Sequence, residues 1–544
     1  MNSDLFFSFM SALLVCMALV PPLRALADRF RIIDVPGGRK VHEYPIPRIG
    51  GMAFALGAYA SILWWGPKDR ITLSVLLGSV IILAFGVWDD RVELGYRTKL
   101  AGQFLAALSP IMLGDVRFEN LPFMPDSPMP AWISIPVTLV FIIGVSNAVN
   151  LADGLDGLAG GLSFLTLSGI AYLAYLSHDS TVLILTLPFL GALLGFLRYN
   201  TYPARIFMGD GGSQLLGFMM GVLAILLTDT ARGPFTPGLA LFLLGLPFLD
   251  TLGVIGQRLA EGRALFVGDR THTHHKLLAA GLSHYEAVTV IYAIQAGMIG
   301  LGYLLRWQSD LVVVPLYLLI AGCVLAGFVA AGRGLLAAPT NATRRFFPNL
   351  TINRFLRGSW LTDMPIRFLA VMVPAFLVTA VLFPTDVPVD VSYLSIVLFG
   401  VVLAGLALLP RFVPYFVRGG LYVGTTCLLY VTEDLWGGSL TAFAVTHHIF
   451  FVVVAVMVLL CLRFNEQSRF QTTPLDYLMV FLAVTFPLLP EVSVDVSALS
   501  LFAGKLIVLF FSFELLLHAF AGRVRQLGFV SLWILLGLGM RIWF

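Results

Sequence analysis

A polar stretch between two apolar runs holds the densest set of residues that could do chemistry. Residues 147–161 read NAVNLADGLDGLAGG and supply two amides (Asn147, Asn150) and two carboxylates (Asp153, Asp156). At the end of a membrane-spanning helix, such groups are costly unless they face a cavity, a partner or a ligand. The glycines at 154, 157, 160 and 161 allow close backbone approach and leave room for a bulky ligand. We interpret this stretch as a binding site.

A second polar stretch, DDRVELGYRTKLAGQ, follows the apolar run 71–88 and contains Asp89, Asp90 and Lys99. Neighbouring residues on a helix point about 100° apart, so Asp89 and Asp90 do not form one tight acid pair. We expect one carboxylate to face a site while the other takes a different partner.

Asp210 opens the sequence DGGS directly before the apolar run 213–228. Free backbone N–H groups at the start of that helix would lie beside the carboxylate. This arrangement suits a diphosphate that is bridged to Asp210 by a hard cation, Mg²⁺ or Mn²⁺. Phe207, at the edge of the same loop, either stacks on a nucleobase or packs within the protein.

Three histidines form a compact cluster with two other basic residues, and the set is Arg270, His272, His274, His275 and Lys276. We expect this cationic cluster to bind an anion. Zinc is an alternative, because three histidines can ligate it. However, no cysteine is near, and the oxygen ligands of the other stretches suit Mg²⁺ or Mn²⁺ better.

Two further features could support the same site. The first loop, residues 34–48, is basic and rich in proline and glycine. It either lines the site, with Lys40 and His42 among its residues, or attracts anionic lipid headgroups. Asp250, late in the apolar run 237–256, is a candidate support residue that could pair with Arg258.

The composition places these stretches in a membrane. Of 544 residues, 58% are hydrophobic and 12% charged, and the mean hydropathy is +0.90, well outside the soluble globular range. A membrane span takes about 20 apolar residues, so we predict an all-α integral membrane protein, a polytopic helical bundle whose first span is retained. The predicted helices are 5–27, 50–65, 71–88, 99–114, 131–148, 157–176, 181–198, 213–228, 237–256, 284–305, 310–331, 365–384, 391–409, 413–431, 439–462, 475–490, 499–520 and 526–543.

The basic residues of the first half concentrate in alternate connections, around 29–48, 91–99, 198–205 and 258–276. By the positive-inside rule these connections are cytoplasmic, and the N-terminus is outside. Every stretch rich in carboxylates, amides or histidines then lies at the inner face of the plasma membrane.

Acidic residues for a divalent cation and basic residues for phosphates, at the inner membrane face, suit phosphoryl transfer from a charged nucleotide to a lipid-borne acceptor. A transporter or channel would instead place ionisable residues near mid-bilayer and show an internal repeat. A non-catalytic scaffold would have a degenerate site. Nothing in the sequence suggests a nucleic-acid partner.

Four ordered motifs support the catalytic interpretation: the DD…K…Q pattern, NAVNLADGLDGLAGG, FMGDGGS and DRTHTHHKLL. Together with the loop RKVH…PRIGG they resemble the polyprenyl-phosphate N-acetylhexosamine-1-phosphate transferases over residues 1–331. The H-x-H-H pattern after Asp-Arg resembles the branch that makes undecaprenyl-diphospho-GlcNAc. The phospho-MurNAc-pentapeptide transferases, which usually have three consecutive histidines there, are the alternative.

The resemblance implies an eleven-span core with a cytoplasmic groove, Mg²⁺, a UDP-amino sugar donor, a polyprenyl phosphate acceptor and UMP as the leaving product. It implies that Asp210 holds Mg²⁺ with help from Asn150, and that Asp89, Asp90 and Asp210 are catalytic. The implied substrate-binding residues are Lys40, His42, Lys99, Asn147, Asn150, Asp153, Asp156, Phe207, Arg270, His272, His274 and His275.

The order of bond making stays open at this point. A phosphate monoester has a second pKa near 6, so the acceptor is largely dianionic at cytoplasmic pH and needs little help from a base. Direct in-line attack on the β-phosphate is therefore our preferred mechanism, and a covalent aspartyl-phosphate on Asp89 is its rival.

The rest of the chain lies outside the resemblance. We expect a basic cytoplasmic linker over 332–364 and a further membrane domain over 365–544, whose function the sequence does not indicate. Glu514 and His518 share one face of a predicted helix, where they mark a headgroup path or hold helices together. A homodimer is left open.

Overall fold

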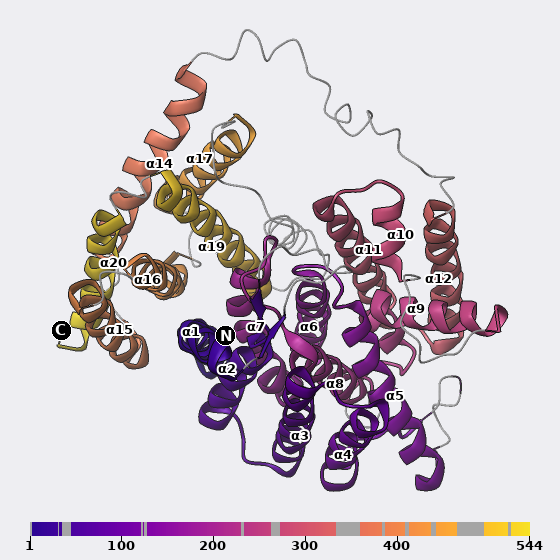
Figure 1. Cartoon of the computed structure of the whole chain (residues 1–544). Coiled ribbons are helices and arrows are strands. Elements are labelled where there is room, and N and C mark those ends of the chain that lie inside the picture. The colour runs from indigo at the N-terminus through magenta and orange to yellow at the C-terminus, as the bar shows by residue number, and fades with distance from the viewer. Residues whose placement is uncertain are drawn as a thin grey trace. The chain divides into compact units, whose positions relative to one another are not determined.

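The computed structural model describes residues 3–30, 32–34, 45–120, 123, 128–229, 233–262, 272–332, 359–382, 387–408, 413–436, 442–464, 494–519 and 524–543 (Figure 1). Within these residues the regular secondary structure is helical, apart from one antiparallel pair of two-residue strands, β1 (Ile33–Asp34) and β2 (Ile46–Pro47). The predicted all-α class is confirmed. The chain forms two compact units, Met1–Thr343 with Thr473–Leu475, and Arg344–Thr472 with Asp476–Phe544.

Each predicted helix of the first unit is present. The helices are α1 (Ser3–Phe30), α2 (Gly50–Trp65), α3 (Arg70–Val92), α4 (Tyr96–Gly114), α5 (Ala131–Ala152), α6 (Leu158–Leu176), α7 (Ser180–Asn200), α8 (Gly209–Leu227), α9 (Leu239–Ala260), α10 (Thr273–Ala279), α11 (His284–Leu304) and α12 (Asp310–Gly332). The short helix α10 was not predicted, because a polar stretch of seven residues has no apolar run to reveal it.

The helix ends extend further into the polar stretches than the apolar runs indicated. The helix α3 continues to Val92, so Asp89 and Asp90 lie in its last turns, and α8 begins at Gly209, so Asp210 lies in its first turn. These motif residues are therefore held by regular backbone and not by loops.

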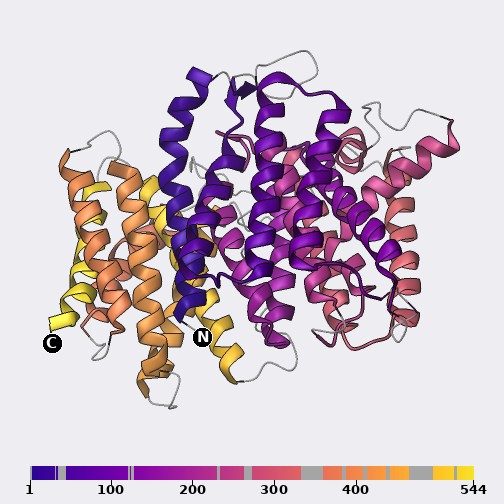
Figure 2. The same ribbon diagram turned by 90° about the horizontal axis from the view of Figure 1, so that it is seen from below.

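Helix α8 is the centre of the first unit. It packs against α2, α3, α5, α6, α7 and α9, and its residues from Gly211 to Leu227 are buried. A helix that is apolar all round is stable only when other elements surround it. The neighbouring helices run alongside it as a bundle (Figure 2).

Glycines let two neighbours approach the first turn of α8. A Cβ on Gly86 of α3 would lie 2.3 Å from the Cα of Gly211, and one on Gly51 of α2 would lie 2.5 Å from the backbone nitrogen of Gly212. No side chain fits at such distances, so only glycine permits this packing. The DGGS sequence therefore serves helix packing as well as the site expected from it.

Helix α9 is broken within its length. Gly245 has φ 41° and ψ −118°, and Pro247 follows it. The amide of Gln295 bridges the break, because its Oε1 accepts from Leu246 N at 2.7 Å and its Nε2 donates to Leu243 O at 3.0 Å. Thr166 Oγ1 also donates to Leu243 O at 3.0 Å. Backbone groups freed inside a membrane need such internal partners.

Within the described part of the chain, ten helices are long and apolar enough to cross a membrane, namely α1, α3, α5 to α9, α11, α12 and α15 (Val389–Leu408). The chain is therefore a multi-pass membrane protein. The finer expectation of eighteen crossings stays a prediction, and the helix predicted over 475–490 lies outside the described residues.

The second unit contains α14 (Ser359–Ala380), α15, α16 (Val413–Trp436), α17 (Ala442–Phe464), α19 (Val494–Ala519) and α20 (Val524–Gly539). Arg418 of α16 donates to Glu514 of α19 at 3.1 Å through Nε, and Tyr422 also donates to Glu514. This arrangement supports the interpretation of Glu514 as a residue that holds helices together.

Candidate active site

The polar stretches of the first unit meet around one cavity of about 770 Å³. Seven of the residues singled out in the sequence line it: Asn150, Asp153, Gly154, Asp156, Phe207, Asp210 and His275. They come from the last turn of α5 and the α5–α6 connection, from the α7–α8 connection and the first turn of α8, and from α10, which are far apart in the sequence. A cavity with several convergent polar groups is the expected form of a small-molecule site.

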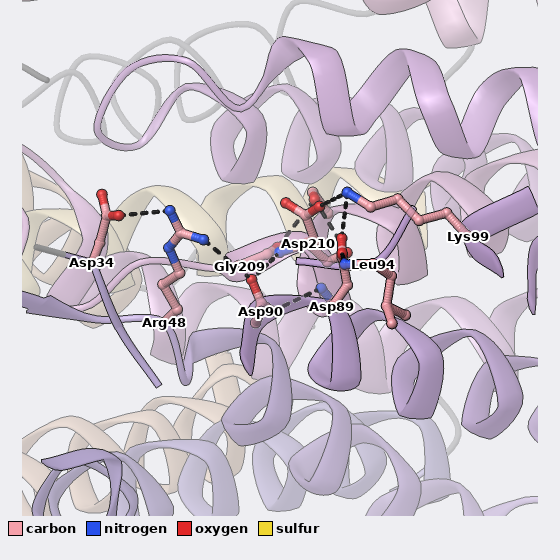
Figure 3. Close-up of polar contacts among 10 residues, drawn as sticks. Asp34, Arg48, Asp89, Asp90, Leu94, Lys99, Gly209 and Asp210 are labelled. Carbon is pink, nitrogen blue, oxygen red and sulfur yellow. Dashed lines mark hydrogen bonds and ion pairs between the residues drawn. The ribbon is translucent and has the colours of Figure 1, made fainter. Parts of the chain in front are cut away.

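Lys99 of α4 connects two carboxylates at this site (Figure 3). Its Nζ lies 2.5 Å from Asp89 Oδ2 and 3.1 Å from Asp210 Oδ2. The Asp89 side chain is only 3% exposed, and its Oδ1 accepts from Leu94 N at 2.6 Å. The Asp210 side chain is 33% exposed and lines the cavity. Asp210 is therefore the member of the pair that a ligand reaches.

Asp90 takes a different partner from Asp89, as the helical geometry predicted, but neither carboxylate lines the cavity. Its Oδ1 accepts from Asp210 N at 2.8 Å and its Oδ2 accepts from Gly211 N at 3.1 Å (Figure 3). A carboxylate at a helix N-terminus satisfies free N–H groups and interacts favourably with the helix dipole. Two of the N–H groups expected to bind a diphosphate are thus occupied by Asp90, which corrects that expectation.

Arg48 extends the cluster toward the first loop. It forms an ion pair with Asp34 at 2.6 Å and lies 3.9 Å from Asp90. A backbone hydrogen bond joins β2 to the α7–α8 connection, because Phe207 N donates to Pro47 O at 2.7 Å. The described part of the first loop therefore lines the site through Arg48 and Asp34, whereas Lys40, His42 and Arg270 lie outside the described residues.

The two asparagines of the central stretch have different surroundings. Asn150 lines the cavity. Asn147, one turn earlier, exchanges hydrogen bonds with Gln103 of α4 at 2.9 and 3.1 Å, and Gln103 also donates to Gln214 of α8 at 3.0 Å. This amide network joins α4, α5 and α8, so the structure places Asn147 in a helix interface and not on the cavity wall.

The two aspartates of this stretch face the cavity. Asp156 Oδ2 accepts from Ala204 N at 2.9 Å, which ties the α5–α6 connection to the α7–α8 connection. Asp153 is exposed at the cavity wall. Desolvation by the surrounding protein and the nearby carboxylates of Asp210 and Asp90 raise the pKa of Asp153 to about 7. The carboxylates converge on a region of negative potential, which suits a cation.

The space at the motif glycines is filled by protein. A Cβ on Gly154 would lie 2.3 Å from Nε2 of His274, and one on Gly161 would lie 1.9 Å from the hydroxyl of Tyr292. At Gly161 the expectation of space for a bulky ligand is wrong, because that space holds Tyr292 of α11. Gly154 makes room for His274 of α10 and also lines the cavity.

The histidines differ from the cationic cluster that the sequence suggested. His274 is buried, and burial, helped by the neighbouring His275, lowers its pKa to about 3. It is therefore neutral at physiological pH. His272 Nδ1 lies 2.8 Å from Asp250 Oδ2, and His275 lines the cavity. Asp250, expected as a partner of Arg258, thus holds the histidine stretch.

Metal ligation by side chains alone finds little support in the described part of the chain, where no three His, Cys, Asp or Glu residues are placed to hold an ion together. Asp210 and Asn150 nevertheless offer hard oxygen atoms to the cavity. Mg²⁺ usually takes one or two carboxylates and completes its shell with waters and substrate phosphates. The donor set therefore fits Mg²⁺ held jointly by protein and ligand.

Sequence reasoning missed several cavity residues: Arg24, Asn200, Tyr202, Arg205 and His284. The rings of Tyr202 and His284 lie 4.5 Å apart at 31°. Asn200 accepts from Gly157 N at 3.1 Å and donates to Ile206 O at 2.9 Å. Asn200, Tyr202 and Arg205 belong to the stretch that carries Asp210, so proximity was their only signal, and His284 had none.

Comparison with known proteins gives a consistent result. Residues 72–228 match the domain described as glycosyl transferase family 4. A probable undecaprenyl-phosphate N-acetylglucosaminyl 1-phosphate transferase of Bacillus subtilis is 33% identical over 290 residues, which is 53% of this chain and 81% of the relative. A decaprenyl-phosphate N-acetylglucosaminephosphotransferase of Mycolicibacterium smegmatis is 34% identical (52% and 76% covered). An undecaprenyl-phosphate alpha-N-acetylglucosaminyl 1-phosphate transferase of Escherichia coli K12 is 25% identical (56% and 84% covered).

Proposed function

This chain belongs to glycosyl transferase family 4, and from that membership we propose that it transfers N-acetylglucosamine 1-phosphate from a UDP-sugar to polyprenyl phosphate, releasing UMP. Such a reaction would start the synthesis of a cell-envelope glycan. The observation that supports it most is the position of Asp210, exposed to the cavity, fixed by Asp90 and paired with Lys99. The matched relatives carry N-acetylglucosamine in their names, which favours this sugar over phospho-MurNAc-pentapeptide.

The cavity supplies the groups that a UDP-sugar needs. Asp210 and Asn150 would hold Mg²⁺, which would neutralise charge on the donor diphosphate as the bond to the leaving phosphate breaks. Lys99 places positive charge beside Asp210, and Arg48 places it beside Asp90. Phe207 lines the cavity and offers an aromatic face to the uracil base. Asp156 lies at the wall that would contact the nucleoside.

The surroundings of Asp89 support direct attack by the acceptor phosphate. Both of its oxygens are engaged, one by Lys99 and the other by Leu94 N, and the side chain is 3% exposed. A nucleophilic carboxylate must reach the β-phosphorus within about 3–3.5 Å. Asp89 instead keeps Lys99 in place, and the acceptor phosphate, already dianionic, attacks the β-phosphate in line.

This mechanism predicts that no phosphorylated enzyme forms. We expect no protein-bound label after the purified chain is mixed with Mg²⁺ and UDP-GlcNAc labelled at the β-phosphate, in the absence of acceptor. Label that appears before the acceptor is added and disappears in Asp89→Asn would establish the covalent route. The same mixture with short-chain polyprenyl phosphate serves as the positive control for turnover.

We assign the reaction to residues 1–331 and to the cytoplasmic face of the plasma membrane. The support for this orientation is the concentration of basic residues at the helix ends and connections that carry the site, including Arg48, Arg91, Arg97 and Arg205. We also propose, as the sequence predicts, that residues 365–544 are an additional membrane domain, and we assign no reaction to it. Homodimer formation remains an open expectation.

The decisive experiment is donor selection. Purified protein is incubated with Mg²⁺, short-chain polyprenyl phosphate and one UDP-sugar at a time, and UMP release is measured. We expect UMP release with UDP-GlcNAc. We expect Asp210→Asn to lose this release while its Tm stays unchanged. The proposal would be contradicted if UMP were released only from UDP-MurNAc-pentapeptide, or if none of the UDP-sugars released UMP.

A further inference from the structure

Asp250 lies beyond the break in α9. Its carboxylate contacts His272 and Thr273, the latter being the first residue of α10. Its Oδ2 contacts Nδ1 of His272 at 2.8 Å. Its Oδ1 accepts from the backbone N of Thr273 at 2.9 Å and also from the Thr273 hydroxyl. Asp250 is 8% exposed, so a charge at this depth requires these three donors.

These contacts determine which nitrogen of His272 carries a proton. A carboxylate that receives two donors from Thr273 acts only as an acceptor, so Nδ1 of His272 must be the donor. In the neutral ring, Nε2 is then unprotonated. A carboxylate that holds one ring nitrogen in this way fixes both the tautomer and the orientation of an imidazole.

The fixed ring is connected to the cavity through its neighbours. His272 stacks on His274 with ring centroids 6.1 Å apart and planes at 5°. His274 contacts the backbone at Gly154, and its ring centroid lies 4.2 Å from that of His275, which lines the cavity. A shift of His272 would therefore move the cavity wall.

Asp250 is itself held in place from two sides. The break at Gly245 is bridged by Gln295 of α11 and Thr166 of α6, which sets the direction of the second half of α9. At the first end of α9, Gly238 N donates to Asp310 of α12 at 2.9 Å. The carboxylate of Asp250 thus stands on a rigid support, as a residue must that positions others.

We propose that Asp250 is a positioning residue for the histidine stretch 272–275: it sets the Nδ1–H tautomer of His272 and, through the buried ring of His274, holds His275 at the cavity wall. This role rests on the proposed function, since the cavity is the site where the donor would bind. Asp250 does not line the cavity, so it would act on the substrate only through the histidines.

Asp250→Asn tests the proposal with little change of shape. The amide oxygen can still accept from Thr273, but the amide NH₂ would face Nδ1 of His272. That ring must then become the acceptor at Nδ1 and carry its proton on Nε2. Nitrogen-15 NMR of histidine-labelled protein reports this change directly, with the His272 signal identified by its loss in His272→Gln.

Asp310→Asn is the matched control, because Asp310 is also a buried carboxylate that accepts from backbone but lies at the opposite end of α9. Loss of a positioning partner typically costs about 10–100-fold in activity, so we expect Asp250→Asn to lose that much kcat/KM for UDP-GlcNAc. We expect Asp310→Asn, at a comparable fall in Tm, to keep activity within about threefold. Thr273→Val, which removes one donor and keeps the shape, gives an intermediate loss, and Thr273→Ser restores it.

Two results would overturn the proposal. One is a wild-type His272 that carries its proton on Nε2. The other is equal activity loss in Asp250→Asn and Asp310→Asn at equal Tm. Failure of this proposal can be distinguished from failure of the proposed function. If the wild type releases no UMP, the NMR measurement of the His272 tautomer still tests the role of Asp250. If Asp250→Asn does not fold, the Thr273 pair and the wild-type spectrum decide the outcome.

Discussion

Asp90 accepts a hydrogen bond from the backbone N–H of Asp210 at a distance of 2.8 Å, across 120 residues of sequence. The same carboxylate also accepts from Gly211 N. It therefore caps the central helix α8 at the residue whose side chain would hold the metal. The adjacent acidic residues of α3 thus divide two tasks: Asp89 pairs with Lys99 and Asp90 fixes Asp210.

Removal of this cap should weaken the site more than the fold. Loss of a helix cap costs about 0.5–2 kcal/mol, and Asp90→Ala would leave two N–H groups at the start of α8 without their acceptor. We expect the Mg²⁺ concentration for half-maximal UMP release to rise by about 2–30-fold, which is the ratio that this free energy corresponds to at 1.36 kcal/mol per factor of ten.

The matched control is Asp179→Ala, which removes the side-chain cap of α7, where Asp179 accepts from Val182 N at 3.0 Å. Its effect on Tm should be similar and its Mg²⁺ requirement unchanged. A shift of the Mg²⁺ requirement in both variants would mean that capping acts only through global stability.

Lys99 should be energetically coupled to Asp89. Lys99→Met leaves Asp89 and Asp210 without the cation between them, and Asp89→Asn removes one of the two charges that the cation balances. Groups in one ion-pair network show coupling energies of about 0.5–3 kcal/mol. We expect the double variant to lose less activity than the sum of the two single losses, measured as kcat/KM for UDP-GlcNAc. Strict additivity would show that Lys99 acts on the substrate alone.

The sequence predicted the helices well because the membrane imposes them. Every apolar run within the described residues became a helix, since a backbone in lipid must satisfy its own hydrogen bonds. The ends were less certain. The helix α8 begins four residues before the run 213–228 because Asp90, far away in the sequence, supplies its cap.

The same reason explains which site residues could be predicted. Asn150, Asp153 and Asp210 are polar groups beside apolar runs. Because a polar group at the end of a membrane span costs free energy unless it has a partner, its presence there indicates a site. Asn147 has the same signature but serves a helix interface, because its partner Gln103 is visible only in three dimensions. The neutral state of His274 also depends on burial, which the cationic appearance of its neighbourhood concealed.

The contact between Gly154 and His274 should be sensitive to a single methyl group. A Cβ at Gly154 would lie 2.3 Å from Nε2 of His274, so Gly154→Ala must displace the ring. We expect a loss of donor affinity of about tenfold, since overpacking costs about 1–3 kcal/mol. In the His274→Ala background the methyl group has space, and Gly154→Ala should then add little further loss. Equal effects in both backgrounds would place the damage elsewhere in the loop.

The pKa of His274 predicts how this segment responds to acid. In the folded protein the ring stays neutral down to about pH 3, whereas an exposed histidine takes up a proton below about 6.5. Above pH 6.5 His274 is neutral in both the folded and the opened segment, so the free energy of opening does not depend on pH through this residue. Below it, only the opened segment gains a proton, and opening becomes up to about tenfold more favourable per pH unit. Hydrogen exchange of α10, corrected for the intrinsic rate, should therefore accelerate between pH 6.5 and 4.5 in the wild type and not in His274→Gln. A wild-type α10 whose corrected exchange is constant over that range would show that His274 is not buried as a neutral ring.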